Sequence, residues 1–413
     1  MTTTATPRAA QQPRATHFGL AMLALAMGGF AIGTTEFVTM GLLPQIAAGV
    51  DVSIPSAGHL ISAYALGVVV GAPVLAFYGA RLPRRALLIS LMAAYAFFNL
   101  LTSLATSYRM LTVARFLDGL PHGAYFGAAA LVAASLAPPD KKGRAVASVM
   151  LGLSVANVVG VPAATWMGQS LGWRSAFLAT TLISLATIAM IWAFVPATPG
   201  NAEATGRREL QAFRNKQVWL TLLAGSIGFG GLFAVYTFIA KTVTDVGGLG
   251  QGAVPVFLLA FGLGMVVGTW FAGELAAWGV FRALFTGAIG SAALMVVFWF
   301  AAPHGWWALP VVFLITGIGS LVTINLQLRL MDVSGDAQTI GANLVHACLN
   351  LANALGAWLG GVVIAAGYGY RSPALVGAVL SVAGIGVLAW SLQAQRRTDA
   401  LDLPALQSSA STS

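Results

Sequence analysis

A single carboxylate interrupts the long apolar run near the beginning of the chain. Glu36 lies between Phe18 and Leu43, in a stretch whose other side chains are apolar, small or hydroxylated. A charged group at the centre of a membrane helix costs about 3 kcal/mol on insertion scales, so such residues usually face a cavity and have a partner. Binding and releasing a proton is the chemistry that a buried carboxylate of this kind can perform.

Three further ionisable residues share one face of a later helix. Arg115, Asp118 and His122 follow one another at i, i+3 and i+7, a spacing that places their side chains on the same side of a helix. His122 carries the imidazole that most readily exchanges protons near neutral pH. This face could therefore hold a cation, a second carboxylate and a proton relay together.

The acid and the arginine are expected at the same depth in a membrane. Glu36 precedes Pro44 by eight residues and Arg115 follows Tyr108 by seven, on helices that run in opposite directions. At about 1.5 Å per residue, both lie roughly 10 to 12 Å below the same surface. The sequence therefore predicts that Glu36 and Arg115 approach each other.

We interpret the pair as a proton-coupling device. Burial favours a neutral carboxyl group and a neighbouring guanidinium favours an ionised one, so a small movement can switch the protonation of Glu36. Asp118 would act as a second acceptor or as a clamp on Arg115, and His122 as a relay. The alternatives are a static buried ion pair that orients two helices, and a His122 that bonds a neighbouring backbone carbonyl.

A polar stripe on another helix is a candidate substrate contact. At 100° per residue its four members fall within about an 80° arc: Asn343, His346, Asn350 and Asn353. Such a stripe is costly against lipid, so it faces either a cavity or a neighbouring helix to which it is hydrogen bonded.

The composition requires that helices position these residues in a membrane. Of 413 residues, 58% are hydrophobic and 8% are charged, against about 25% charged residues in soluble chains. Each apolar stretch is long enough to cross the roughly 30 Å hydrocarbon layer as a helix. The twelve stretches are 18–43, 57–79, 86–105, 109–136, 144–169, 173–195, 217–241, 252–277, 281–301, 305–329, 339–367 and 373–394. The expected fold is an all-α membrane protein.

The charge distribution sets the orientation. The net charge is +9, but when the chain is drawn with twelve crossings, most Lys and Arg residues fall in loops and tails on one side of the membrane. This distribution argues against nucleic-acid binding and places both termini in the cytoplasm. The expected parts are a tail (1–17), a six-helix bundle (18–195), a cytoplasmic linker (196–216), a second six-helix bundle (217–395) and a tail (396–413). The single Cys348 excludes an internal disulfide.

An internal repeat relates the two bundles. A shift of about 197 residues brings "LGVVVG" (66–71) onto "LGMVVG" (263–268) and "GWRS" (172–175) onto "GYRS" (369–372). Six helices per half give both halves the same orientation, an architecture whose substrate site lies between the halves near the middle of the membrane.

The repeat adds candidate substrate contacts in both halves. Phe233 corresponds to Glu36 and Tyr236 to Thr39, so rings in the second half stand where the first half has polar groups. Thr39 and Asn157, which match Tyr236 and Asn353, complete the candidate set. Ionisable groups on one wall and aromatic rings with amides on the other suit a compact amphiphile. Aromatic residues in such segments also commonly face lipid.

The chain resembles transporters of the major facilitator superfamily. The resemblance lies in "GTTEFVTMGLLPQIA", "SAGHLISAYALGVVVGAPVLA", "ARFLDGLPHGAYFGAAA" and "ANVVGVPAATWMGQSLGWRSAF". Within this superfamily the chain resembles in particular the AraJ-like branch of the drug:proton antiporter group, which includes sugar and chloramphenicol exporters. It implies that Glu36 is the acid of the first helix and that Arg115 opens the motif of the fourth helix.

The resemblance also implies gating residues. Gly152, Gly160 and Pro162 resemble the antiporter motif of the fifth helix, although Val161 separates the usual Gly-Pro pair. "ARLPRR", with Arg81, Arg84 and Arg85, resembles the cytoplasmic signature after the second helix, but Ala80 and Pro83 stand where the signature has aspartate and glycine. Glu274 in "GELAAWG" is a decayed copy of that signature in the second half and a candidate structural or gating residue.

We therefore expect a monomeric transporter of the bacterial inner membrane that exports a small organic molecule in exchange for protons. The alternatives are a proton symporter or facilitator for sugar-like solutes, and a membrane sensor that binds a ligand without transport. An enzyme is not expected, because the sequence has no paired nucleophile and base, metal cluster or phosphate loop. No cofactor or metal is expected either.

Overall fold

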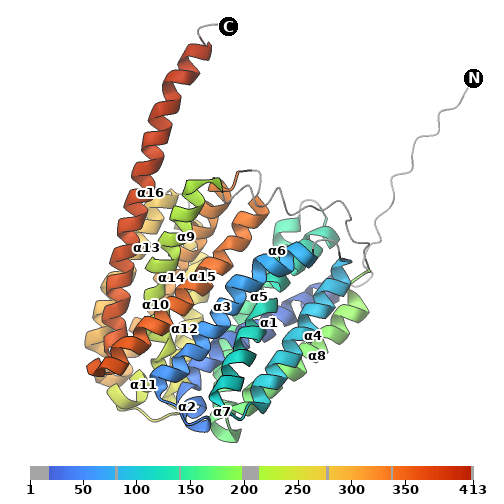
Figure 1. Cartoon of the computed structure of the whole chain (residues 1–413), viewed down its shortest axis with the longest axis vertical. Coiled ribbons are helices and arrows are strands. Elements are labelled where there is room, and N and C mark those ends of the chain that lie inside the picture. The colour runs from blue at the N-terminus through green and yellow to red at the C-terminus, as the bar shows by residue number, and fades with distance from the viewer. Residues whose placement is uncertain are drawn as a thin grey trace, which may run out of the picture.

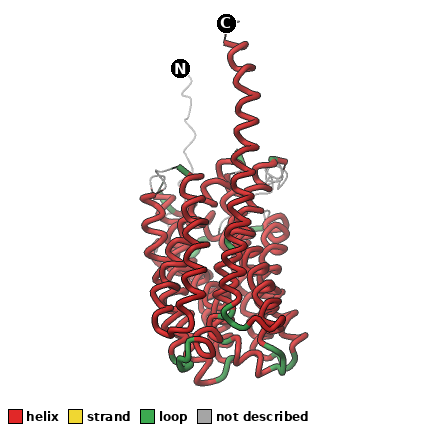
Figure 2. The backbone as a smooth tube through the Cα atoms, turned by 90° about the vertical axis from the view of Figure 1, so that its left-hand side faces the viewer, coloured by secondary structure: helices red, strands yellow, loops and turns green. Residues whose placement is uncertain are grey.

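A computed structural model gives the fold of residues 18–79, 82–138, 141–197, 214–275, 279–335 and 338–410; the side chains of 76–77, 273–275, 338–343 and 398–410 are outside the description. Arg81, the two predicted tails up to residue 17 and beyond 410, and most of the predicted linker lie outside the described residues. Those described form helices and short connections without a strand, and the helices run along one common axis (Figure 2).

The first six membrane crossings are built from eight helices and one π-helical turn. They are α1 (Phe18–Gly41) with the short α2 (Leu43–Gly49), α3 (Ile54–Gly79), α4 (Arg84–Leu104), α5 (Tyr108–Leu136), α6 (Lys142–Val155) with η2 (Ala156–Gly160) and α7 (Val161–Leu171), and α8 (Arg174–Phe194).

The last six crossings follow the same order. They are α9 (Lys216–Gly228) with α10 (Gly230–Thr237), α11 (Ile239–Lys241) and η4 (Thr242–Val246), α12 (Ala253–Leu275), α13 (Val280–Ala301) with η6 (Ala302–Trp307), α14 (Ala308–Val333), α15 (Gln338–Val363) with η7 (Ile364–Tyr368), and α16 (Ser372–Ala410). Figure 1 shows α16 leaving the bundle at the end where the chain enters α1. We call this the terminal end, and the opposite end, with α2 and α11, the distal end.

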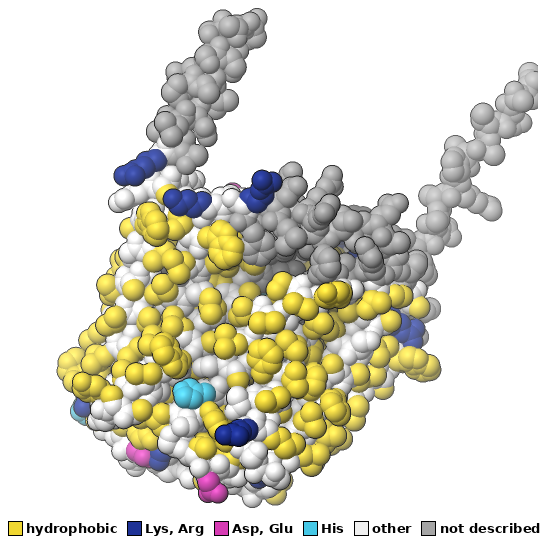
Figure 3. All heavy atoms as spheres, viewed as in Figure 1, with side chains coloured by type: hydrophobic (Ala, Val, Ile, Leu, Met, Phe, Trp, Pro, Cys, Tyr) yellow, Lys and Arg dark blue, Asp and Glu magenta, His cyan; other side chains and the backbone are white. Residues whose placement is uncertain are grey.

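These helices match the predicted crossings closely. Ten stretches of the described chain are long and apolar enough to span a membrane, and the stretch Val280–Val333 contains both α13 and α14. The remaining crossing is α5, which carries Arg115, Asp118 and His122. Hydrophobic side chains are spread over the face of the bundle that Figure 3 shows, as a lipid-facing surface requires.

Two predicted crossings are less regular than the sequence suggested. The fifth predicted helix contains a π-helical turn at η2. In the seventh, α9 ends at Gly228 and α10 begins at Gly230. π-helical turns of this kind occur often at functional sites. The last helix continues past its predicted end at residue 394 to Ala410.

Glycines at repeat-related positions bring matching helix pairs together. A Cβ atom on Gly67 of α3 would lie 2.1 Å from the carbonyl oxygen of Phe116 in α5. A Cβ atom on Gly264 of α12 would lie 2.3 Å from the carbonyl oxygen of Phe313 in α14. The two contacts differ by a constant shift of 197 residues, so both halves use the same close helix approach.

We expect Gly67→Ala to destabilise the protein by about 1 to 3 kcal/mol, because overpacking of a tight contact costs this much. Gly386→Ala in α16 is the matched control, since a Cβ atom there meets nothing within 4 Å. Thermal unfolding of the purified variants measures the difference. Equal melting temperatures for the two variants would contradict the tight α3–α5 contact.

A second repeated contact fixes the distal end of each half. Arg174 donates to the carbonyl oxygen of Ala105 at 2.8 Å, at the end of α4. Arg371, its counterpart, donates to the carbonyl oxygen of Trp299 at 2.9 Å, in the last turn of α13. Each guanidinium thus satisfies a carbonyl near the carboxyl end of a helix, where cations are favoured.

Candidate functional site

Glu36 lies near the distal end of α1, where the two halves face each other. Its side chain is 6% exposed, and among the described residues it has no hydrogen bond or ion pair. Arg115 of α5, Tyr64 of α3 and Tyr236 of α10 lie within electrostatic range of its carboxylate. The carboxylate therefore lies in a buried site that is bordered by both halves.

Arg115 forms its ion pair with Asp118 on the same helix. One guanidinium nitrogen lies 2.7 Å from Asp118 Oδ2, and the two side chains are 1% and 0% exposed. The guanidinium also packs over the ring of Tyr64 at 4.3 Å and near Phe177 at 5.5 Å. Its Nε and second terminal nitrogen have no hydrogen bond within the described part of the chain. Arg115 can therefore donate to another anionic or carbonyl oxygen without leaving Asp118.

Arg115 is paired with Asp118 and not with Glu36 in the described residues, so the static Glu36–Arg115 ion pair that the sequence left open does not form there, while the clamp role of Asp118 stays a prediction. Helical spacing puts Asp118 one turn from Arg115, so their contact needs no approach of separate helices. Glu36 is near Arg115 but forms no ion pair with it among the described residues.

Asn99 of α4 is a buried polar residue that sequence reasoning missed. Its amide nitrogen donates to Asp118 Oδ1 at 2.6 Å, and its amide oxygen accepts from the Thr35 hydroxyl at 3.0 Å. A lone amide in the apolar run "AAYAFFNLL" is costly in a membrane, and that cost was the signal that could have identified it.

The His122 side chain of α5 lies close to residues of both halves. Its Nδ1 is hydrogen bonded to the hydroxyl of Tyr64 at 3.0 Å, not to a neighbouring backbone carbonyl, while its ring lies 6.3 Å from that of His346 in α15. The ring of Phe126 stacks on that of His346 at 5.3 Å. The structure thus brings together two histidines that the sequence assigned to different roles.

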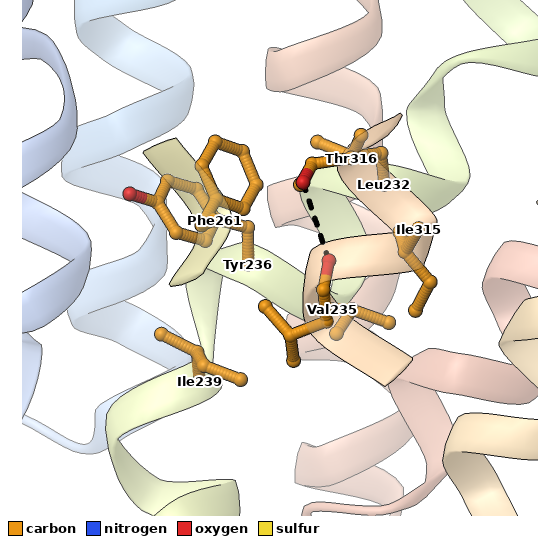
Figure 4. Close-up of a pocket in the computed structure, with 8 residues that line it drawn as sticks. Leu232, Val235, Tyr236, Ile239, Phe261, Ile315 and Thr316 are labelled. Carbon is orange, nitrogen blue, oxygen red and sulfur yellow. Dashed lines mark hydrogen bonds between the residues drawn. The ribbon is translucent and has the colours of Figure 1, made fainter. Parts of the chain in front are cut away.

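Aromatic rings from the two halves meet beside Glu36. Phe37 of α1 lies 5.8 Å from the ring of Tyr236, which stacks on Phe261 of α12 at 3.6 Å. Figure 4 shows these last two rings beside a cavity of about 10 Å³, enough for one water molecule. The Tyr236 hydroxyl has no hydrogen-bond partner within the described residues.

Three predicted amides carry free polar atoms in the interior. Asn157 and Asn350 each donate to a carbonyl oxygen one turn earlier, which leaves their Oδ1 atoms without a partner among the described residues. Asn353, which is 0% exposed, has no partner for either amide atom there. Because buried polar groups are nearly always hydrogen bonded, these atoms need water or a ligand.

The other predicted substrate contacts show only local interactions among the described residues. Thr39 donates to the carbonyl oxygen of Thr35, at 3.4 Å. Phe233 packs against Phe229 in its own half, with ring centroids 5.6 Å apart. The side chain of Asn343 lies outside the described residues.

The predicted gating residues divide into two groups. A Cβ atom on Gly160 would lie 2.3 Å from the Thr34 hydroxyl, so this glycine and the following Pro162 let the bulged fifth crossing approach α1. Arg85 donates to the carbonyl oxygen of Trp192 and packs on its ring, a contact between α4 and α8 within one half.

For the remaining predicted gating residues, the described structure shows no side-chain contact that bears on a gate. Arg84 is partly buried at the start of α4. The side chain of Glu274, like Arg81, lies outside the described residues.

The halves also touch at the distal end. Gln45 of the first half donates to Gln251 Oε1 of the second at 3.2 Å, and Gln169 donates to the Gln251 carbonyl oxygen at 3.2 Å. Behind these amides lies a cavity of about 140 Å³ that the pair Lys241 and Asp245 also lines. No group of three or more His, Cys, Asp or Glu residues suited to a metal occurs in the described chain.

Comparisons with known proteins agree with this architecture. The sequence model of the Major Facilitator Superfamily matches residues 25–341. The chain is 39% identical to the inner membrane transport protein YdhP of Escherichia coli K12 over 92% of this chain and 97% of that protein. It is 37% identical to a chloramphenicol resistance protein of Streptomyces lividans over 62% of this chain and 66% of that protein.

The fold is also similar to a solved structure. The crystal structure of a D-xylose-proton symporter superimposes with a TM-score of 0.69 at 16% identity, over 90% of this chain and 97% of that one. With the twelve crossings and the repeated glycine contacts, these matches confirm the expected fold class and the resemblance noted in the sequence. The chain belongs to the major facilitator superfamily, a family of multi-pass membrane transporters of small molecules.

Proposed function

We propose that this transporter exports a small organic molecule in exchange for protons by alternating access. The observation that carries the proposal is Glu36, a buried carboxylate between the two halves without a partner among the described residues. Such a group is costly in apolar surroundings unless it binds a proton or gains a cation. It can therefore alternate between these two states as the halves move.

Arg115 is the cation that stabilises the ionised state of Glu36 in this proposal. Its guanidinium has two nitrogens free of hydrogen bonds among the described residues while Asp118 holds it in place. In this proposal a shift of α1 against α5 brings Glu36 to the guanidinium and releases its proton. A substrate that binds between the halves drives the same shift, so proton and substrate occupy the site alternately.

The free polar atoms of the interior support a compact amphiphilic substrate. Tyr236, Asn157, Asn350 and Asn353 offer polar atoms without partners in the described structure. The rings of Phe37, Tyr236 and Phe261 add an apolar surface where the two halves meet. Binding pockets of this type combine apolar walls with a few polar groups that orient the ligand. The name of the chloramphenicol resistance protein supports a drug-like solute.

The energetics suit export by one proton. An elementary charge that moves down a potential of 100 mV supplies about 2.3 kcal/mol, which sustains a roughly 50-fold gradient of a neutral solute. The name of YdhP supports an inner-membrane location, and the excess of Lys and Arg at the terminal end supports a cytoplasmic orientation of that end. One chain contains both halves of the pathway, so we propose a functional monomer.

Other assigned roles remain proposals. His122 and His346 lie between Asp118 and the terminal end of the bundle, where they could relay protons. Arg81, Arg84, Arg85 and Glu274 are proposed to act at the cytoplasmic gate, and Gly160 and Pro162 to let the fifth crossing bend.

The test is transport by the purified chain in liposomes under an imposed pH gradient. Sugars, phenicols and nucleosides are first screened for thermal stabilisation of the protein, and stabilising solutes are then assayed for uphill movement against the proton flux. Accumulation that collapses with a protonophore supports the proposal. Stabilisation by a solute that is never transported would favour a membrane sensor instead.

Tyr236→Phe is expected to weaken solute binding about 2- to 10-fold, because one neutral hydrogen bond contributes about 0.5 to 1.5 kcal/mol. Its melting temperature should not fall, since the Tyr236 hydroxyl bonds to no described residue. Tyr125→Phe is the control: its hydroxyl donates to the Leu25 carbonyl oxygen at 2.9 Å, so stability rather than affinity should fall. Titration calorimetry and thermal unfolding separate the two effects, and unchanged affinity in Tyr236→Phe would remove Tyr236 from the site.

A further inference from the structure

Asn99 joins three helices of the first half through one buried amide. From α4, it donates to Asp118 Oδ1 in α5 at 2.6 Å and to the Tyr95 carbonyl oxygen of its own helix at 3.0 Å. Its oxygen accepts from Thr35 in α1 at 3.0 Å. Asn99, Asp118 and Thr35 are all 0% exposed.

The surroundings fix the orientation of this amide. The nitrogen faces two acceptors, a carbonyl and a carboxylate, and the oxygen faces a hydroxyl that can donate. The reversed amide would place its oxygen against both acceptors. The network therefore assigns a donor, not an acceptor, to the atom that faces Asp118.

Asp118 then receives a donor on each oxygen. Asn99 donates to Oδ1, and Arg115 donates to Oδ2 at 2.7 Å. A proton on either oxygen would compete with one of these hydrogen bonds, at a carboxyl group that is 0% exposed. Hydrogen bonds to the charged form favour that form, so the network holds Asp118 as a carboxylate.

Glu36 has the opposite surroundings. It receives no hydrogen bond from a described residue, although Thr35, its neighbour in the chain, is tied to Asn99. The ionisable groups around the two acids are Tyr64 of α3, Tyr95 of α4, Arg115 and His122 of α5, and Tyr236 of α10. Of these groups, only Arg115 donates to either carboxylate within the described part of the chain.

We propose that Asn99 is the positioning residue that directs the transported proton to Glu36 by keeping Asp118 ionised. The inference rests on the proposed proton exchange and adds which of the two buried acids, Glu36 or Asp118, carries the proton. Asn99 touches neither proton nor substrate in this account. It acts through Asp118, and through Thr35 it ties that state to the position of α1.

The test measures proton release when a transported solute is added to the purified protein in weak buffer. Glu36→Gln alone should release no protons. In Glu36→Gln with Asn99→Leu, Asp118 loses one donor and can hold the proton, so release should return to at least about a tenth of the wild-type amount. A double variant that binds solute but releases nothing overturns the inference.

Two variants guard against a folding artefact. Thr35→Val keeps the shape of the side chain and removes the donor to the Asn99 oxygen, which loosens the amide against Asp118, so release should return partly in the Glu36→Gln background. Thr102→Val is the control on α4, since the Thr102 hydroxyl donates only to the Phe98 carbonyl oxygen of its own helix among the described residues. Release in the Thr102→Val, Glu36→Gln pair equal to that with Asn99→Leu would also overturn the inference.

Infrared difference spectra distinguish this inference from the proposed function. The carboxylic-acid band of the solute-free protein should vanish in Glu36→Gln, persist in Asp118→Asn, and reappear in Glu36→Gln with Asn99→Leu. A band that vanishes in Asp118→Asn overturns the role of Asn99 while proton exchange itself stands. A wild-type protein that transports solute without proton release overturns both.

Discussion

Glu36→Gln is expected to abolish uphill transport while leaving solute exchange intact. Glutamine keeps the size of the side chain and cannot release a proton, so a pH gradient loses its coupling to the movement of the halves. When the pH gradient is set to a proton-motive force of 100 mV, the accumulation ratio should fall from about 50 toward 1, the loss of the roughly 2.3 kcal/mol that one proton then supplies. Exchange of labelled for unlabelled solute, which needs no net proton movement, should stay within about threefold of wild type. Both are measured in the same liposomes.

The control for this prediction is a carboxylate that lies outside the site. Asp332 of α14 is 71% exposed and pairs with Arg329 at 2.9 Å. Asp332→Asn should retain the accumulation ratio. If Glu36→Gln still accumulates solute against its gradient, another group carries the proton.

Removing one partner of the Arg115 and Asp118 pair is expected to destabilise the protein by about 3 to 5 kcal/mol. Each side chain is almost completely buried, so a lone partner would remain as an uncompensated charge. Arg115→Met and Asp118→Leu should each show this loss, and the double variant should recover much of it, because no charge is then left unpaired. Equilibrium unfolding in detergent measures the cycle.

An exposed ion pair gives the matched comparison. Lys241 and Asp245 lie 2.6 Å apart with side chains 26% and 41% exposed. Their double-variant cycle should give about 0 to 1 kcal/mol. Equal coupling energies for the two pairs would contradict the claim that burial makes the Arg115 and Asp118 pair the more strongly coupled one. The recovered Arg115→Met, Asp118→Leu protein should remain inactive in uphill transport.

The twelve crossings were predictable because membrane helices must satisfy their backbone groups internally. That constraint makes apolar length a direct guide to the helices. The predicted ranges match them within a few residues, except that α16 continues from the predicted end at residue 394 to Ala410. The turn at η2 was not predictable from apolar length, which is the same for an α-helical and a π-helical segment; the close approach of Gly160 to α1 is a tertiary contact that the sequence does not show.

The ionisable residues of the site were predictable for a related reason. A charge inside an apolar run is rare and costly, so Glu36, Arg115 and Asp118 were visible at once. The pairing of Arg115 with Asp118 follows from their spacing, but the absence of an ion pair at Glu36 among the described residues was not predictable. The contact of Arg115 with Asp118 is local, whereas the position of Glu36 between the halves depends on how α1 and α10 meet.

Neutral residues of the site gave weaker signals. Asn99 was missed because one amide in an apolar helix costs less than a charge, although it is the group that bonds Asp118. Phe37 and Phe261 are ordinary residues of apolar helices, and only the meeting of the halves identifies their contact with Tyr236. Phe233, which the repeat selected, packs within its own half instead.

The central claim is that substrate and proton alternate at Glu36. Its most direct test is the number of protons that purified protein releases when a transported solute is added at a pH where the site is protonated. We predict about one proton per wild-type molecule and none for Glu36→Gln, with solute binding retained in both. Equal release from the two proteins would contradict the account.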